Sequence, residues 1–122
     1  MNTQLISEYR GMNISFQGQV DTEHFQNVVD YIYGHPDFDD FLYLLVDFSQ
    51  VTQLSLRDDF FKILAATDRA AARTNPHIRI AAVSTNPKIT EQIASYHHEQ
   101  NIWPLRQFDE RSSAQDWLLQ QK

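Results

Sequence analysis

The sequence predicts one α/β domain over residues 1–122, with a mixed, mostly parallel five-stranded sheet flanked by four helices. Three observations lead to this fold class. Segments of strand period and of helical period follow one another in the order β-β-α-β-α-β-α-β-α. The apolar run 41–46 does not alternate, as is typical of a strand covered on both faces of a parallel sheet. No linker or repeat divides the 122 residues, an ordinary length for one domain.

The strands follow from local apolar patterns. They are expected at residues 5–9, 12–16, 41–46, 78–83 and 105–108. The first two alternate and are separated by Arg10-Gly11, which predicts an antiparallel hairpin. Each later strand follows a helix, so crossover connections make the later strands parallel.

The helices are expected between capping and breaking residues. The expected caps are Asp21 or Thr22, Ser55 in a capping box with Asp58, Asn86 before Pro87, and Ser112 or Ser113. Gly34, in a left-handed cap, and Pro36 end the first helix, and Asn75-Pro76 ends the second. We expect Phe60, Ile63, Leu64, Thr67 and Ala71 to form the inner face of the second helix. One core is expected to contain Phe25, Val29, Leu44, Leu45, Val46, Leu64, Ile80, Ala82 and Ile93.

The composition excludes several classes of protein. Because the chain has no cysteine, disulfides, thiolate catalysis and cysteine metal sites are excluded. A net charge of −6 opposes binding to nucleic acid or to an anionic membrane, since both require neutralisation of phosphates. The polar residues 1–4 lead directly into a strand, and the run 41–46 is too short to span a bilayer. We therefore expect a cytoplasmic protein with no signal peptide and no membrane insertion.

Several kinds of catalytic or cofactor site are also missing from the sequence. The three glycines are far apart, so neither a phosphate-binding loop nor a dinucleotide fingerprint is present, and no Gly-x-Ser-x-Gly elbow occurs. Residues 37–40 lack the glycine and glutamate of a calcium loop and are interpreted as a solvated acidic turn. His97 and His98 are neighbours on a helix and point about 100° apart, so they cannot chelate one metal ion. No metal and no cofactor are expected.

Two motifs, together with the order of elements, resemble the STAS family of SpoIIAA-like domains, which includes anti-sigma-factor antagonists. Residues 44–54 are similar to the buried strand of that family, which ends in Asp-x-Ser-x-Val. Phe108-Asp109, followed by Ala-x-x-Trp-Leu at 114–118, is similar to the end of SpoIIAA-like proteins. The resemblance implies a STAS/SpoIIAA-like fold and a module that binds other molecules. A relationship to SEC14-like lipid-binding domains is often drawn for this fold and implies a small apolar ligand.

The sequence departs from that family at its regulatory serine. When the chain is aligned on residues 47–49, the phosphorylatable serine of STAS regulators falls at Arg57, and the aspartate before it falls at Ser55. The glycine that follows the serine falls at Asp58. The resemblance therefore implies a module without the serine phosphorylation switch. We expect Ser55 to be a helix cap rather than a phosphorylation site.

Asp47 is the principal candidate for a ligand-binding residue. It follows the most apolar strand, and ligands of open α/β sheets bind beyond the carboxyl ends of strands. The same edge is expected to gather Ser49, Ser84, Thr85 and Asn86. An acid among hydroxyls can hold a polar ligand or act as a general base. Alternatively, Asp47 accepts backbone N–H groups within its own loop, as aspartate does in many turns.

The aromatic residues exceed what one small core requires. They include Tyr31, Tyr33, Phe38, Phe41, Tyr43, Phe61 and Trp103. If they form an exposed patch, a protein partner or a homodimer is expected there. If instead each is partly buried, no such surface is implied.

The sequence thus favours a non-enzymatic binding or regulatory module over an enzyme. Its expected partner is either another protein or a small apolar ligand. The alternative is a small hydrolase-type enzyme with a site around Asp47 and Ser84 or Thr85. A closed apolar cavity between the helices and the sheet would favour an apolar ligand.

Overall fold

The computed structural model describes residues 3–8 and 10–120 and has the predicted order of elements. The predicted first strand extended to Tyr9, which lies outside the described residues. The strands are β1 (Thr3–Glu8), β2 (Gly11–Asp21), β3 (Tyr43–Ser55), β4 (Arg79–Val83) and β5 (Leu105–Phe108). The helices are α1 (Thr22–Tyr33), α2 (Phe60–Thr74), α3 (Pro87–Gln100) and α4 (Arg111–Leu119), with a 3₁₀ turn, η1, at Phe38–Asp40.

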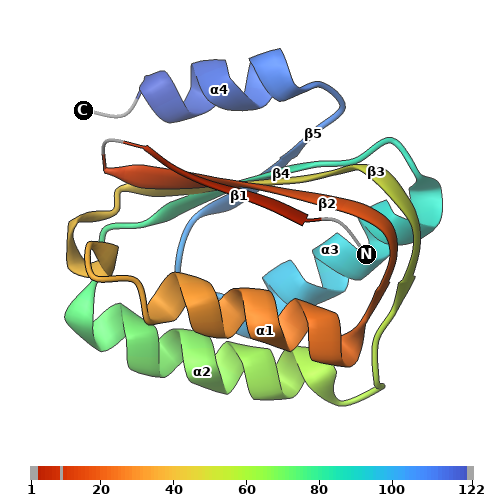
Figure 1. Ribbon diagram of the computed structural model, residues 1–122, viewed down its shortest axis with the longest axis horizontal. Coiled ribbons are helices and arrows are strands. Elements are labelled where there is room, and N and C mark those ends of the chain that lie inside the picture. Colours follow the sequence, from red (N-terminus) through yellow and green to blue (C-terminus); the bar gives the residue numbers. More distant parts are fainter. Residues whose placement is uncertain (1–2, 9, 121–122) are drawn as a thin grey trace.

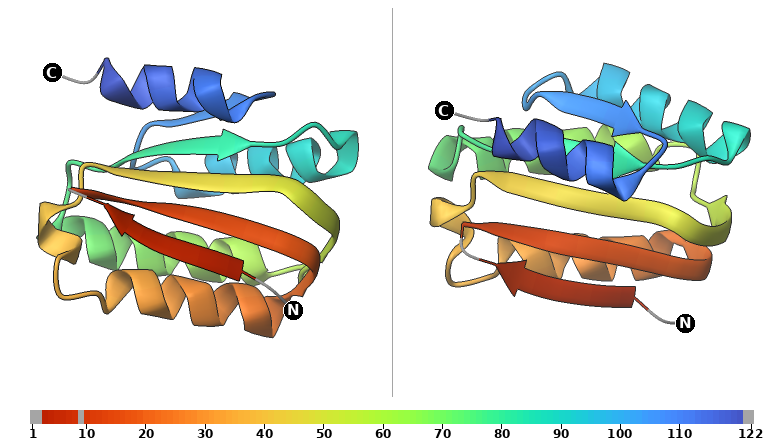
Figure 2. Two further views of the ribbon diagram at one scale, coloured as in Figure 1. Left: turned by 45° about the horizontal axis from the view of Figure 1, so that its top comes forward. Right: turned by 90° about the horizontal axis from the view of Figure 1, so that it is seen from above.

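The five strands form one sheet in the order β1-β2-β3-β4-β5. β1 pairs antiparallel with β2, and each of the other neighbouring pairs is parallel, which confirms the predicted mixed, mostly parallel sheet. Helices α1, α2 and α3 cover one face of the sheet, and α4 lies on the other (Figure 1). The molecule therefore has three layers, and Figure 2 shows α4 above the half of the sheet that contains β4 and β5.

β2 and β3 are much longer than the sequence predicted. Their parallel pairing continues to Asp21 and Ser55, with irregular register after Ser15 and again after Gly18. β4, by contrast, stops where Val83 pairs with Asp47. The second half of β3 is thus stabilised by pairing with β2, which is distant in sequence. The residues of this half are mostly polar, so their pattern does not predict a strand. The sequence had suggested that Asp47 directly follows the strand, but Asp47 lies within β3.

The prediction that Ser55 begins a helix is wrong. Ser55 is the last residue of β3, and α2 begins five residues later with Asp59 as its cap residue. The pairing of Ser55 with Asp21 extends the sheet to this point, and that gain prevails over the local capping signal. Instead, the Thr22 hydroxyl accepts the backbone N–H of Arg57 at 2.8 Å.

The other helix ends agree with the sequence in part. Asp21 caps α1 by accepting the N–H of His24 at 2.8 Å, and Asn86 caps α3 before Pro87, both as predicted. Gly34 ends α1 as expected, but with φ of −90° and not in a left-handed conformation. α4 begins at Arg111, so the predicted caps at residues 112–113 lie inside its first turn.

The core lies on both faces of the sheet, and this corrects the expectation of a single core. Of the nine residues predicted to share it, all except Leu45 line one space between the sheet and α1–α3. Leu45 points to the opposite face, where it packs with Ala81, Val83, Ala114 and Leu118 beneath α4. Successive residues of a strand point to opposite faces, so Leu44 and Leu45 cannot share one side.

Truncating Leu45 to alanine is expected to lower the free energy of unfolding by about 2–5 kcal/mol. The side chain is 1% exposed and belongs to the small cluster that attaches α4 to the sheet. Urea denaturation measures this loss of stability. Leu119→Ala is the control, because Leu119 is on α4 but is 80% exposed. A loss below about 1 kcal/mol for Leu45→Ala would contradict this packing.

No helix among the described residues is both long enough and apolar enough to cross a membrane.

Candidate functional site

Asp47 lies on the sheet face that α4 covers, and both of its carboxylate oxygens are engaged. Oδ1 accepts the backbone N–H of Ser49 at 2.8 Å. Oδ2 accepts Nη1 of Arg111, the first residue of α4, at 3.1 Å, and the same nitrogen contacts the Ser15 hydroxyl at 3.2 Å. The Arg111 side chain thus joins β2, β3 and α4. Asp47 does accept a nearby backbone N–H, which was the alternative considered from the sequence, but the bond lies within β3 and not in a loop.

Ser84, Thr85 and Asn86 connect β4 to α3, and their side chains serve that connection. The Ser84 hydroxyl is buried and contacts the Thr90 hydroxyl at 3.3 Å. The Asn86 side chain accepts the N–H groups of Lys88 and Ile89, and Thr85 is exposed. The described hydrogen bonds therefore tie Asp47 to α4 and Ser84 to α3, on opposite faces of the sheet. Among the five predicted residues, the hydrogen bonds join Asp47 to Ser49 and Ser84 to the Asn86 carbonyl, and Ser49 is exposed.

Of the seven surplus aromatic residues, three are buried, three are partly buried and one is exposed. Phe38, Phe41 and Trp103 are at most 4% exposed, whereas Tyr31 is 51% exposed. The exposed large apolar side chains in the described part of the chain are Ile6, Tyr31, Ile63 and Leu119. These lie on four different elements, so they do not form the aromatic patch that would have marked a dimer surface.

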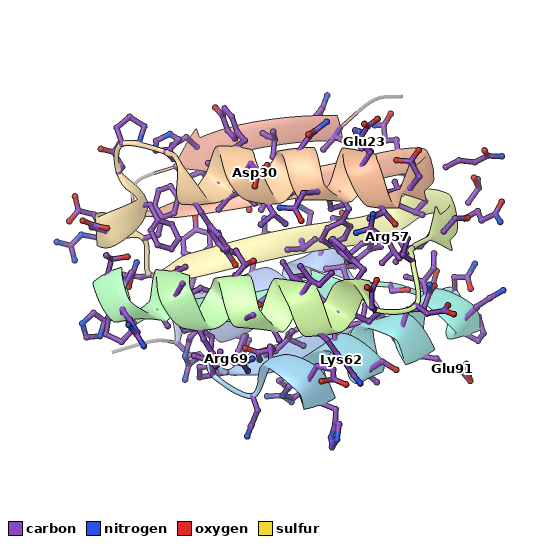
Figure 3. All side chains as sticks on the ribbon, turned by 90° about the horizontal axis from the view of Figure 1, so that it is seen from below. Glu23, Asp30, Arg57, Lys62, Arg69 and Glu91 are labelled. Carbon is purple, nitrogen blue, oxygen red and sulfur yellow. The ribbon has the colours of Figure 1, made fainter. Side chains whose placement is uncertain are left out.

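One hollow of the molecule, called the inner cavity below, lies between the sheet and the three helices of one face. Its volume is about 80 Å³, and it is lined by side chains from β2–β5 and from α1, α2 and α3. Figure 3 views this layer from the helix side, with charged residues such as Asp30 and Lys62 on the outer surface of the helices. Every lining residue is aliphatic or aromatic, and Tyr33 and Tyr96 are the two that carry a hydroxyl.

The sequence did not predict the buried acid next to this cavity. Asp68, on α2, is 0% exposed. One of its carboxylate oxygens accepts the hydroxyl of Tyr33 from α1, and the other accepts the hydroxyl of Tyr96 from α3. Tyr33, Asp68 and Tyr96, called the tyrosine–aspartate cluster below, therefore join the three helices that enclose the inner cavity.

Burial determines the ionisation of this cluster. Desolvation raises the pKa of Asp68, although the two tyrosine hydroxyls and the nearby Arg69 act in the opposite direction. Desolvation, together with the negative charge of Asp68, raises the pKa of both Tyr33 and Tyr96 well above 10.0. Both tyrosines are therefore neutral hydrogen-bond donors at physiological pH.

A signal for Asp68 is present in the sequence. Position 68 follows Phe60 and Leu64 at intervals of four, so it falls on the buried stripe of α2. The predicted inner face contained Ile63 and Thr67 besides Phe60, Leu64 and Ala71, but it did not contain Asp68. Ile63 is in fact 43% exposed. A carboxylate is rarely buried without a partner, and the two tyrosines that solvate it come from distant helices.

We expect the difference in stability between the wild type and Asp68→Asn to change with pH. Because the folded pKa of Asp68 is raised above its ordinary 3.8, the folded state retains this proton to a higher pH than the unfolded chain. The stabilisation is complete below the unfolded pKa and is lost as the pH rises through the folded pKa. In urea denaturation from pH 3 to 7, the wild type should therefore lose stability relative to Asp68→Asn. A relative gain would show that the pKa is lowered.

Known protein families and curated proteins provide no match to the sequence. The structure is similar to the anti-sigma factor antagonist SpoIIAA in its unphosphorylated form, with a TM-score of 0.64, 11% identity and coverage of 99% of this chain and 100% of that one. The phosphorylated form of the Bacillus cell fate determinant SpoIIAA has a TM-score of 0.63 and 9% identity, covering 95% and 99% of the two chains.

A third solved structure extends the comparison. It is an uncharacterized protein of the DUF3478 family with a SpoIIAA-like fold from Shewanella loihica PV-4, with a TM-score of 0.60 and 11% identity. The alignment covers 96% of this chain and 92% of that one. The chain therefore has the SpoIIAA-like (STAS) fold, as the sequence predicted.

Proposed function

We propose that this protein is a non-enzymatic regulatory module that binds a small apolar ligand in its inner cavity. The observation that supports this most directly is the cavity of about 80 Å³ with its aliphatic and aromatic lining. One water needs about 10–15 Å³ of such volume and two to four polar partners, which this lining does not supply. An apolar ligand needs no such partners, and each Å² of apolar surface that it buries contributes about 25 cal/mol.

A protein partner is the second part of the proposal. The likeness to SpoIIAA, an anti-sigma factor antagonist, over nearly the whole chain supports a regulatory, protein-binding role. The position of the STAS phosphoserine is occupied by Arg57 before α2, so phosphorylation there is not available to this chain. Occupancy of the inner cavity, which lies against α1 and α2, would then take the place of phosphorylation in controlling the partner surface. We propose the cytoplasm as its location. The homodimer predicted from the sequence stays a prediction, because no exposed aromatic patch among the described residues supports it.

The geometry does not favour the hydrolase alternative. A general base must lie within hydrogen-bonding reach of the group it activates. Asp47 is occupied by Arg111 and by the N–H of Ser49, and the Ser84 hydroxyl contacts Thr90 instead.

Native mass spectrometry of the protein isolated gently from its own cells tests the proposal. The expected result is a population that retains a small molecule, which organic solvent releases and which an Ala82→Leu variant lacks. Ala82 is 2% exposed, lies on β4 and lines the inner cavity, so the larger side chain occupies the ligand's place. If the wild type carries no molecule and does not bind toluene when it is added, the proposed function is wrong.

A further inference from the structure

Tyr33 lies between two hollows of the molecule and borders both of them. Its ring lines the inner cavity, and it also lines a second hollow, open to the surface, between the end of α1, η1 and α2. This outer hollow is bordered on α2 by Thr67 and Ala71, which flank Asp68 at one and three residues. The hydroxyl of Tyr33 bonds to Asp68 at this boundary. A displaced Tyr33 side chain would join the two spaces beside the Asp68 carboxylate.

Among the described residues, the buried Asp68 carboxylate forms no ion pair, although the more distant charge of Arg69 favours its ionised form. Its hydrogen bonds come from the neutral hydroxyls of Tyr33 and Tyr96. The ion pairs within the described part of the chain involve Asp47 and Asp59 instead. Buried carboxylates are ordinarily paired with a cation, and a hydrogen bond from a charged donor is about twice as strong as one from a neutral donor. An ammonium group in place of the Tyr33 hydroxyl would supply a charged hydrogen-bond donor in direct contact with Asp68.

The outer hollow has the same electrostatic preference. Among the described residues that line it, Asp39 carries a charge, and neither lysine nor arginine is present. His35, which also lines this hollow, accepts the N–H of Asp37 through Nδ1 at 3.0 Å. The whole chain carries a net charge of −6. A carboxylate or phosphate head group would meet repulsion here, whereas an amine would be attracted.

We propose that the ligand is a single-chain amphiphile with a primary amine head, whose chain fills the inner cavity and whose ammonium displaces the Tyr33 hydroxyl from Asp68. The chain is held by the apolar lining and the head by the carboxylate and the remaining Tyr96 hydroxyl. This inference rests on the proposed function, since it names the ligand of the same cavity. It requires no covalent step.

Three ligands with the same chain and different heads test the assignment. Octylamine, octanol and octanoate are titrated by calorimetry, and octylamine is expected to bind at least tenfold more tightly than octanoate. In Asp68→Asn, the preference for octylamine over octanol should disappear. Asp116→Asn is the matched control, because it removes the same charge from an exposed position on α4, on the opposite face. Its octylamine affinity should change by less than twofold.

Tyr33→Phe provides a second, independent test. The variant keeps the ring but removes the hydroxyl that competes for Asp68, so octylamine should bind several-fold more tightly. If Asp68→Asn does not fold, this variant alone decides the question. Equal affinity for octanoate and octylamine, or an unchanged octylamine affinity in both variants, overturns the amine assignment. If toluene binds the wild type while the octyl series shows no preference, only this inference fails. If toluene also fails to bind, the proposed function fails with it.

Discussion

Replacing Trp103 by alanine is expected to lower the free energy of unfolding by about 3–5 kcal/mol. Trp103 is 2% exposed and is among the largest fully buried side chains. Its indole N–H donates to the Asn75 carbonyl at 3.1 Å, and its ring packs edge-on against Tyr33, with 6.1 Å between the ring centroids. The substitution thus opens a void, leaves a buried carbonyl without its donor and removes the support behind Tyr33.

Urea denaturation of Trp103→Ala and Trp103→Phe separates these contributions. Phenylalanine keeps much of the apolar contact but cannot donate to Asn75, so its loss of stability should be intermediate. A loss below about 1 kcal/mol for the alanine variant would show that Trp103 is not packed as described. Because Trp103 packs against Tyr33, the alanine variant should also bind toluene with altered affinity.

Filling the inner cavity is expected to abolish ligand binding with little change in stability. Ala82→Leu places additional carbon atoms into the void, where they gain dispersion contacts that the lining now lacks. The affinity for toluene should fall at least tenfold, or about 1.4 kcal/mol. The free energy of unfolding should change by less than about 1 kcal/mol, whereas overpacking of a full core costs about 1–3 kcal/mol.

Ala66→Leu is the control for this experiment. Ala66 is exposed on α2, so leucine there adds the same atoms without entering the inner cavity. Its toluene affinity should match that of the wild type. Wild-type affinity in Ala82→Leu would mean that the ligand binds elsewhere. A loss of stability beyond about 3 kcal/mol would mean that the space is already filled.

The parts of the fold that were predicted correctly depend on signals close together in the chain. The run 78–83 and the short segment 105–108 became β4 and β5, and Asn86 before Pro87 caps α3 as its sequence suggests. The extension of β3 to Ser55 could not be predicted in this way, because its stability comes from pairing with β2. Where a local capping signal and a long-range strand pairing competed, the pairing prevailed.

The candidate site shows the same division between local and distant information. The bond from the Ser49 N–H to Asp47 matches the alternative considered from the sequence, because Ser49 is two residues away, although it lies within β3 and not in a loop. The ion pair with Arg111 spans 64 residues and has no local signal. The sequence did not predict the inner cavity itself. It indicated only that an apolar cavity between the helices and the sheet would favour an apolar ligand. Asp68 was missed because a carboxylate on an apolar stripe is explained only by Tyr33 and Tyr96, which come from two other helices.

The central claim is that the inner cavity accepts an apolar ligand, and methyl NMR with added toluene tests it most directly. The ring current of bound toluene shifts nearby methyl resonances. The account predicts saturable shifts for Ile14, Val28 and Ile93, which line the inner cavity. Leu45, Val83 and Leu118, which pack on the other face beneath α4, should keep their resonances and serve as the internal control. The absence of saturable shifts at the first group, or equal shifts in both groups, would contradict the account.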